Sequence, residues 1–296
     1  MLDYRIETFI TLCKERNYSK TAQKLCITQP AVTQHIQYLE RFYNCKLFEY
    51  ENKQLKLTQQ GMILERMAVG LSASSNRFKA MIQELEKKQK NFSIGVTATV
   101  SEYMISRIIT PLLKEDPDLN IHVRTDSTPN LINQLKNGTI ECAFIEGPFN
   151  GQEFRYHKFI TGSYTLASKN KLTCTEVKDL LTETIITKEP DSSGFQLLSQ
   201  ALIQQGSDIC DFANHVYTND PNLIKQLVLN GSGIGLLYKD AIQKELDDGL
   251  LYEVPLNLNL TQDFHFITLM DNMFFDAYDK FFDFACNTYH QETTNP

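Results

Sequence analysis

Two short helical patterns, separated by only a few residues near the start of the chain, constrain the fold more than any other feature. The first is SKTAQKL at residues 19–25, and the second is TQPAVTQHIQYLE at residues 28–40. In the first pattern Ala22 and Leu25 fall on one face, and Ser19 is placed to cap the helix. The close spacing predicts that the two helices pack together as helix, tight connection and helix.

A further helix is predicted ahead of this pair and ends near Glu15. Apolar residues recur there at helical spacing, namely Ile6, Phe9, Ile10 and Cys13. The later helix of the pair has a capping residue in Thr28 and tolerates Pro30, because the amide that proline lacks would have no intrahelical acceptor in the first turn. Its inward stripe consists of Val32, Ile36, Leu39 and Tyr43. The chain therefore begins with three packed helices.

The outward face of the last of these helices is polar but uncharged. It presents Gln29, Thr33, Gln34 and Gln37. A glutamine amide can donate and accept together on adenine, and threonine offers a hydroxyl and a methyl group to thymine. The alternative is an ordinary solvated face. Because these residues lie at the start of the helix, where such helices enter the major groove, we expect recognition of base edges.

The segment that follows, at residues 46–58, reads as a β-hairpin with a polar turn at residues 51–53. A hairpin placed after a helix-turn-helix is a wing, and Lys53 and Lys56 are its candidates for phosphate contact. One long helix is then predicted from Thr58 to about Lys90. Its apolar positions alternate steps of three and four, which indicates a dimerisation helix; they are Leu64, Met67, Leu71, Ser74, Phe78, Met81 and Leu85.

Charge is distributed unevenly along the chain. The net charge is −7, but residues 1–90 hold 15 Lys and Arg against 9 Asp and Glu, while the remainder holds 14 against 27. A basic segment joined to an acidic one is expected when only one domain meets phosphate. The start of the chain has no signal-peptide pattern and no window is apolar enough for a membrane span, so we expect a cytoplasmic protein that does not contact membranes.

The seven cysteines are scattered and never form a CxxC pair. This pattern predicts neither a disulfide framework nor a zinc site, and most of these residues are expected to be buried. The histidines show no metal-binding spacing, so no metal and no cofactor are expected. No nucleophile motif is present, so the chain is not expected to be an enzyme. A redox sensor that uses its cysteines remains the alternative.

From Phe92 onwards, short apolar strands alternate with amphipathic helices, which predicts a mostly parallel α/β fold. FSIGVTATV at residues 92–100 is expected to be a strand, and residues 101–117 a single helix. Ligands of such sheets bind at the carboxyl ends of strands. The rule points to Thr97–Ser101 after the first strand. Ser192–Gly194 are a second candidate because they stand where a helix begins and offers free amides.

Residues 2–65 resemble the DNA-binding domain of the LysR-type transcriptional regulators. The matching segments are SKTAQKL, TQPAVTQHIQYLE, KLF and LTQQG. The resemblance places the base-contacting positions of that family on Gln29, Pro30, Thr33 and Gln34. The sequence departs from the family after Leu47-Phe48, where the family favours arginine and this chain has Glu49-Tyr50, so phosphate contact is expected to shift towards Lys53.

The remainder of the chain is similar to the two-lobed, periplasmic-binding-protein-like effector domain of the same family. The implied domains are a winged helix-turn-helix at 1–58, a linker helix at 59–90 and an effector domain at 91–296. Within the effector domain, lobe I comprises about 91–161 and 266–296, and lobe II about 162–265. The expected effector contacts are Thr97, Thr99, Ser101, Glu146, Ser192, Ser193 and Gly194. Since Glu146 adds a negative group to the cleft, a ligand with an amino group or with mixed charge is a further expectation.

The resemblance implies a regulator that binds double-stranded DNA as a homodimer or homotetramer, responds to a small-molecule effector and contacts RNA polymerase. Two alternatives come from other classes of protein. The effector region could belong to a solute-binding protein, or to an enzyme built on the two-lobed fold. The attached winged domain argues against the first, and the missing catalytic constellation argues against the second.

Overall fold

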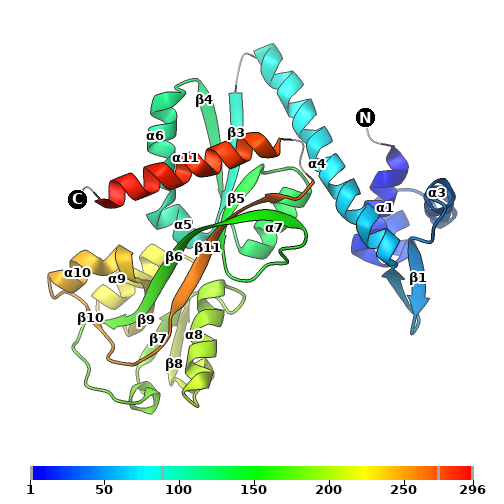
Figure 1. The fold of residues 1–296 in the computed structure, drawn as a ribbon. Helices are drawn as coiled ribbons and strands as arrows, with labels where there is room; N and C mark the ends of the chain where they lie inside the picture. The colour runs from blue at the N-terminus through cyan, green and yellow to red at the C-terminus, as the bar shows by residue number, and fades with distance from the viewer. Residues whose placement is uncertain (1–2, 88–89, 272–273, 295–296) are drawn as a thin grey trace.

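The computed structural model describes residues 3–87, 90–271 and 274–294. It consists of a small N-terminal domain and a two-lobed α/β domain, joined by one long helix (Figure 1). The N-terminal domain contains α1 (Tyr4–Glu15), α2 (Tyr18–Lys24), α3 (Gln29–Phe42), β1 (Phe48–Glu51) and β2 (Gln54–Leu57). The expected fold class, a winged helix-turn-helix followed by a linker helix and an α/β effector domain, is confirmed.

The caps of the helix-turn-helix differ in one place from the sequence expectation. Asn17, and not Ser19, caps α2: its side-chain oxygen accepts a hydrogen bond from the Lys20 amide at 2.9 Å. Both residue types suit this role, and the helix begins at the earlier of the two. Thr28 caps α3 as expected and accepts from the Ala31 amide at 3.3 Å.

The wing is a tight antiparallel hairpin in which Glu51 pairs with Gln54. Its two turn residues, Asn52 and Lys53, have φ angles of 50° and 62°. Positive φ at both central residues matches the right-handed twist of the flanking strands, so the hairpin closes without splaying. Leu55 and Leu57 then face the core of the N-terminal domain.

The linker helix α4 (Gln59–Lys87) divides its apolar residues between two environments. Leu64 packs on the N-terminal core and Ser74 is buried, so these two positions do not belong to an outer stripe as expected. The exposed apolar residues of α4 are Met62, Ile63, Met67, Leu71, Phe78 and Ile82. The side chain of Leu85 lies outside the described residues. An exposed apolar stripe therefore exists, and it keeps Met67, Leu71 and Phe78 of the predicted one.

A single twisted sheet runs through both lobes in the order β4-β3-β5-β11-β6-β9-β7-β8. In lobe I it contains β3 (Lys90–Val96), β4 (Leu119–Thr125) and β5 (Cys142–Glu146), which are parallel to one another. In lobe II it contains β7 (Thr184–Thr187), β8 (Asn214–Tyr217) and β9 (Ile234–Tyr238), also parallel, with β10 (Tyr252–Glu253) at the edge of β6. Two strands cross between the lobes, β6 (Phe154–Ser168) and β11 (Thr261–Leu269), and they pair antiparallel.

Helices cover the sheet on both sides (Figure 1). Lobe I carries α5 (Ala98–Tyr103), α6 (Ile105–Glu115), α7 (Thr128–Lys136) and α11 (Phe275–Thr294), and lobe II carries α8 (Ser193–Gln204), α9 (Pro221–Leu229) and α10 (Gln243–Asp247). Short 3-10 turns lie at Val177–Leu180, Ile209–Asp211 and Lys239–Ile242. The largest apolar cluster includes Phe144 in lobe I, Leu198 in lobe II and Phe264 between them, so the lobes share one core.

Two predicted elements have different bounds in the structure. The strand expected at residues 92–100 ends at Val96, and the chain turns at Thr97 into the short helix α5. The single helix expected at residues 101–117 is broken at Met104. The run of β-branched residues after Val96 favours a strand, but Thr97 takes the extended conformation of a helix cap and the following residues are helical.

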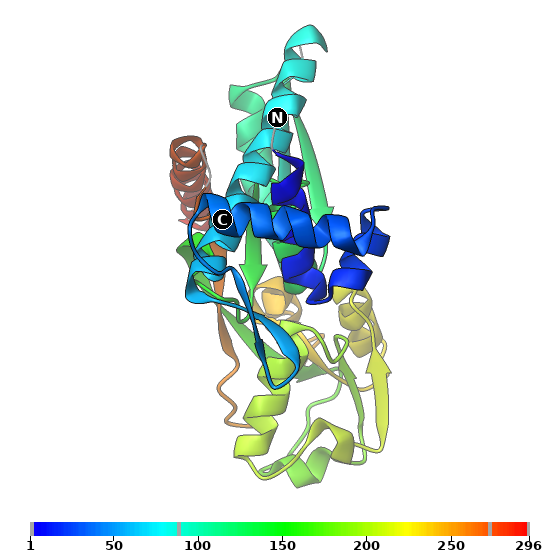
Figure 2. The same ribbon diagram turned by 90° about the vertical axis from the view of Figure 1, so that its right-hand side faces the viewer.

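The linker helix rests on lobe I. Arg77 of α4 forms an ion pair with Glu141 at 3.2 Å and donates a hydrogen bond to the carbonyl of Asn91. Arg66 lies 3.2 Å from a carboxylate oxygen of Asp271. The N-terminal helices and the wing lie on the opposite side of α4 from the large sheet (Figures 1 and 2). This arrangement leaves α3 and the wing open to a large partner.

Candidate DNA interface and inter-lobe cavity

The expected reading face of α3 is on the surface of the molecule. Gln29, Pro30, Gln34 and Gln37 are exposed and Thr33 is half-buried, while Val32 and Ile36 on the other side are fully buried. The Gln29 amide donates to the Thr33 hydroxyl at 3.3 Å. The first turns of the helix therefore offer amide and hydroxyl groups that are held weakly by each other and can exchange those partners for base edges.

The two lysines of the wing are not equivalent. Lys56 donates to Glu51 at 2.5 Å across the hairpin, so part of its charge is neutralised. The same contact holds the pKa of Glu51 below its usual range. Lys53 is exposed at the tip of the turn. Phosphate contact is therefore better supported for Lys53 than for Lys56.

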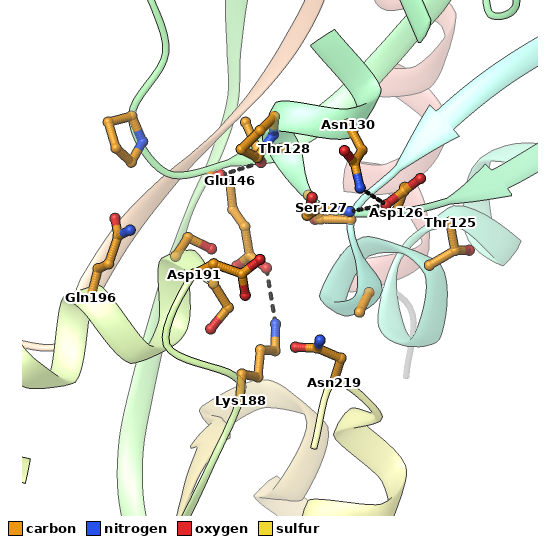
Figure 3. Close-up of a pocket in the computed structure, with 16 residues that line it drawn as sticks. Thr125, Asp126, Ser127, Thr128, Asn130, Glu146, Lys188, Asp191, Gln196 and Asn219 are labelled. Atoms are coloured by element: carbon orange, nitrogen blue, oxygen red, sulfur yellow. Dashed lines mark hydrogen bonds and ion pairs between the residues drawn. The ribbon is translucent and has the colours of Figure 1, made fainter. Parts of the chain in front are cut away.

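The second candidate site is a cavity of about 410 Å³ between the lobes (Figure 3). It lies where β4, β5 and β7 end and where α7 and α8 begin. Its lining consists of Thr97, Ala98, Thr125, Asp126, Ser127, Thr128, Pro129, Asn130, Glu146, Pro148, Lys188, Asp191, Ser192, Ser193, Gln196 and Asn219. The volume is that of a site for a small molecule.

A buried ion pair forms one wall of this inter-lobe cavity. The Lys188 Nζ lies 3.0 Å from Glu146 Oε1, and the two side chains are 10% and 2% exposed. Tyr164 and Thr99 also donate hydrogen bonds to the Glu146 carboxylate. Burial alone would raise the pKa of Glu146, but the Lys188 charge and these hydrogen bonds outweigh it and hold the pKa below its usual range. Glu146 is therefore a carboxylate at neutral pH and pairs with the lysine as an ion.

Two helices of the opposite lobes begin at the cavity. Ser192 caps α8 and accepts from the Phe195 amide at 3.2 Å, while the amides of Ser193 and Gly194 come earlier and have no acceptor within the helix. Ser127 stands at the cap position of α7 without a side-chain cap bond. Thr97 is 4% exposed, and its hydroxyl oxygen has no hydrogen-bond partner within the described residues. These groups suit the oxygen atoms of a small polar ligand.

The structure brings together some of the predicted effector residues and not others. Thr97, Glu146, Ser192 and Ser193 line the cavity. The lining leaves out Thr99, whose hydroxyl belongs to the buried Glu146 cluster, Ser101, which bonds to Thr125 at 2.9 Å, and Gly194, which is buried in the first turn of α8.

Sequence reasoning missed Lys188 and Asn219, as well as the lining residues at Thr125–Asn130. Each of these positions lies at or just after the end of a parallel strand: Thr125 ends β4, Lys188 follows β7, and Asn219 comes soon after β8. The rule that ligands bind at the carboxyl ends of strands would have identified them if it had been applied to every strand.

The cysteines show little sign of activation. All seven are free. Burial raises the pKa of the Cys13 and Cys142 thiols, and the hydrogen bond and charge of Asp208 raise the pKa of the exposed Cys210. A raised pKa disfavours the reactive thiolate at these positions. Within residues 3–87, 90–271 and 274–294, no group of three or more metal-ligating side chains is placed to hold an ion. No helix in that part of the chain is long and apolar enough to cross a membrane.

An exposed recognition helix with a wing, joined by a long helix to a two-lobed domain with an internal cavity, defines a ligand-responsive DNA-binding protein. Comparison with family models gives the same result. Residues 4–62 match the bacterial regulatory helix-turn-helix protein, lysR family, and residues 86–285 match the LysR substrate binding domain. The chain belongs to the LysR family of transcriptional regulators, which combine a helix-turn-helix DNA-binding domain with an effector-binding domain.

Individual relatives are distant but cover most of the chain. The HTH-type transcriptional regulator CysL of Bacillus subtilis (strain 168) is 27% identical over 81% of this chain and 82% of its own length. A probable RuBisCO transcriptional regulator of Gracilaria tenuistipitata var. liui is 26% identical over 81% of each. Among solved structures, full-length BenM has a TM-score of 0.57 at 20% identity and covers 99% of this chain and 98% of its own. An H2O2-bound mutant of Corynebacterium glutamicum OxyR has a TM-score of 0.59 at 17% identity, covering 97% and 92%. The structural matches establish the fold.

Proposed function

We propose that α3 reads the base edges of double-stranded operator DNA and that a small polar molecule in the inter-lobe cavity changes this binding. The observation that carries the first part is the uncharged face of α3, where Gln29, Pro30, Gln34 and Gln37 are exposed and Thr33 is half-buried. The helix α3 lies on the side of α4 away from the effector sheet (Figure 1). Its amides favour adenine and its threonine methyl favours thymine, so the half-site is rich in A·T pairs.

Reading a whole operator in this way requires a homodimer, because one helix-turn-helix covers only one half-site. The exposed apolar residues of α4 give the surface for it: Ile63, Met67, Leu71, Phe78 and Ile82. In the proposal, paired α4 helices hold two winged domains on an interrupted palindrome, and two such dimers form a homotetramer. The protein acts in the cytoplasm, through contact with RNA polymerase and by binding rather than by catalysis.

The inter-lobe cavity supplies the regulation. Its walls come from both lobes, so a ligand that contacts Ser127 and Ser193 together favours one relative position of the lobes over another. The buried charge pair of Lys188 and Glu146 is already neutralised within the protein. The ligand is therefore recognised by hydroxyls, amides and helix amino termini.

The test is fluorescence anisotropy of the full chain on DNA from upstream of its own gene, against random DNA of the same length. We expect a clear preference that Thr33→Ala/Gln34→Ala removes, at a cost of about 1–3 kcal/mol per lost base contact. Gln23→Ala, an exposed residue on α2, is the matched control. If the double variant keeps the wild-type preference on operator fragments selected from the genome, α3 is not the reading element.

A further inference from the structure

A second cavity adjoins the inter-lobe cavity. It also measures about 410 Å³ and lies between the start of α8 and the crossing strand β11. Pro148, Ser193 and Gln196 line both spaces, so the two are parts of one cleft. The proposed function does not use this second cavity.

The charges around the combined cleft are strongly one-sided. Among its lining residues, all of which the structure describes, the acidic ones are Asp126, Glu146, Asp191 and Asp263, and the basic one is Lys188. Lys188 is already paired with Glu146, and Asp263 is paired with Lys158, so the excess of negative charge comes from Asp126 and Asp191. Burial lowers the pKa of His265, which keeps that imidazole neutral at neutral pH and adds no positive charge. A ligand that carried only negative charge would meet net repulsion here.

The second cavity also holds polar atoms that a ligand can bind. The Gln262 side-chain oxygen is a buried acceptor with no hydrogen-bond partner within the described residues. The buried His265 Nδ1 also has no partner there, and it accepts or donates according to the tautomer of the ring. The Oδ1 atom of Asp263 accepts from the Lys158 ammonium group at 2.8 Å and from the Thr161 hydroxyl at 2.7 Å. The other carboxylate oxygen, Oδ2, is left for a donor on the ligand. The buried Gln262 oxygen is costly unless a ligand or water donates to it, while the Asp263 side chain is 42% exposed and open to a ligand.

The inter-lobe cavity, in contrast, presents hydrogen-bond donors where α8 begins. The amides at the start of α8, and the Thr97 hydroxyl, which has no partner among the described residues, can donate to ligand oxygen atoms. The positive end of the helix dipole adds to this attraction. Of the three carboxylates that also line this cavity, Glu146 is paired with Lys188, Asp126 accepts from the Ser127 amide, Asn130 and Gln134, and Asp191 is exposed. The cleft therefore offers donors at the start of α8 and, in the second cavity, acceptors that include the Asp263 carboxylate.

We propose that the effector is a small mixed-charge molecule, an amine that also carries an acidic group. Its ammonium group binds Asp263 and Gln262 in the second cavity, and its acidic group binds at the start of α8 in the inter-lobe cavity. This inference rests on the proposed function, because it assigns the chemistry of the ligand to the same regulatory cleft.

The test is calorimetric titration of the full chain with glycine, β-alanine, γ-aminobutyrate and their longer ω-amino homologues. Each is compared with the acid and the amine of the same length that lack the other charge. We expect at least one amino acid to bind about tenfold more tightly than its matched acid and amine, since each charged hydrogen bond is worth that much. Asp263→Asn and Gln262→Met should each abolish this advantage.

Asp116→Asn is the control. Asp116 forms an ion pair with Lys90 at 2.8 Å, just as Asp263 does with Lys158, but Asp116 does not line the cleft. The inference is overturned if no homologue binds, if the acids bind as tightly as the amino acids, or if both cleft variants keep the wild-type preference. DNA anisotropy separates the two proposals: selective DNA binding without any amine effect leaves the proposed function standing and removes only the ligand class.

Discussion

The ammonium group of Lys188 in lobe II lies 3.0 Å from the carboxylate of Glu146 in lobe I. The same nitrogen donates to the Thr99 hydroxyl at 2.6 Å, so a lysine from one lobe is held by groups of the other. Such a pair is weak evidence for stability as a whole, because both charges had to leave water. Its significance is positional: it fixes the distance between the lobes at the wall of the cavity.

Lys188→Met should be strongly destabilising, because it leaves the Glu146 carboxylate buried without its counter-charge. The expected cost is about 3–5 kcal/mol, and Lys188→Met/Glu146→Gln should recover much of it. Thermal unfolding of the full chain, followed by circular dichroism, measures both. Lys90→Met is the control, since its exposed pair with Asp116 should be worth only about 0–1 kcal/mol. Equal melting of the two single variants would refute the role assigned to the pair.

Acid should weaken the protein through the same carboxyl group. The folded-state pKa of Glu146 lies below the ordinary value of 4.5, so its contribution to stability is complete above that pH and is lost as the pH falls through the folded pKa. Urea unfolding at a series of pH values should show a steeper loss below about pH 4.5 in wild type than in Glu146→Gln. Parallel curves for the two proteins would mean that other carboxyl groups govern acid unfolding.

Gly147 has φ +90°, and a Cβ at this position would lie 2.7 Å from the Cβ of Ser193 in the other lobe. Gly147→Ala should therefore force α8 away from lobe I, in addition to a backbone penalty of about 1–2 kcal/mol. Gly206→Ala is the matched control, because Gly206 has φ +75° and nothing within 4 Å of its added Cβ. Thermal melts should show a larger loss at position 147, and a loss of equal size at both would show that the lobes tolerate the added methyl group.

The wing lysines should differ in their effect on DNA binding. Lys53→Ala should weaken binding to all sequences alike and lower the salt slope by about one unit, as expected for one phosphate contact. Lys56→Ala should have a smaller effect, because Lys56 is held by Glu51 at 2.5 Å. Anisotropy titrations over a range of salt concentrations measure both slopes. A larger change for Lys56 would reverse the assignment.

Leu71 is 50% exposed near the middle of the apolar stripe on α4. Leu71→Asp should shift the protein towards monomer at low micromolar concentration, because it puts a charge into the proposed contact between linker helices. Light scattering coupled to size exclusion measures the mass. Gln83→Asp, at another exposed position of α4, should leave the mass unchanged. A mass for Leu71→Asp that equals the wild-type value would place the interface elsewhere.

The N-terminal domain could be predicted almost completely because its signals are local. Helical spacing, the Thr28 cap and the polar turn predicted at residues 51–53 each act over a few residues. The structure confirms the cap and narrows the turn to Asn52-Lys53, but Tyr43 of the predicted inward stripe is 46% exposed at the end of α3. The error at Asn17 has the same origin: two residues of similar capping ability stand close together, and local sequence does not decide between them.

The cavity was predicted only in part because its key contact is not local. A lysine that follows a buried strand is normally expected at the surface. The burial of Lys188 depends on Glu146, Thr99 and Tyr164, which lie far from it in the sequence. The turn at Thr97 was missed for a related reason, since its β-branched neighbours favour a strand. Whether a chain bends after such a strand is decided by the packing of α5 against the rest of lobe I.

The crossing strands determine what a ligand can move. β6 and β11 pair from Phe154 opposite Leu269 to Ser163 opposite Thr261, with one irregularity between Phe264 and His265, so lobe II cannot slide along lobe I without breaking this ribbon. Rotation about the ribbon is the freedom that remains, and the Lys188–Glu146 pair restrains it at the wall of the cavity. Both the linker helix and α11 rest on lobe I, so this rotation leaves them in place and carries the outer helices of lobe II through space. A neighbouring subunit or partner that contacts those helices is therefore the first to be displaced when a ligand fills the cleft.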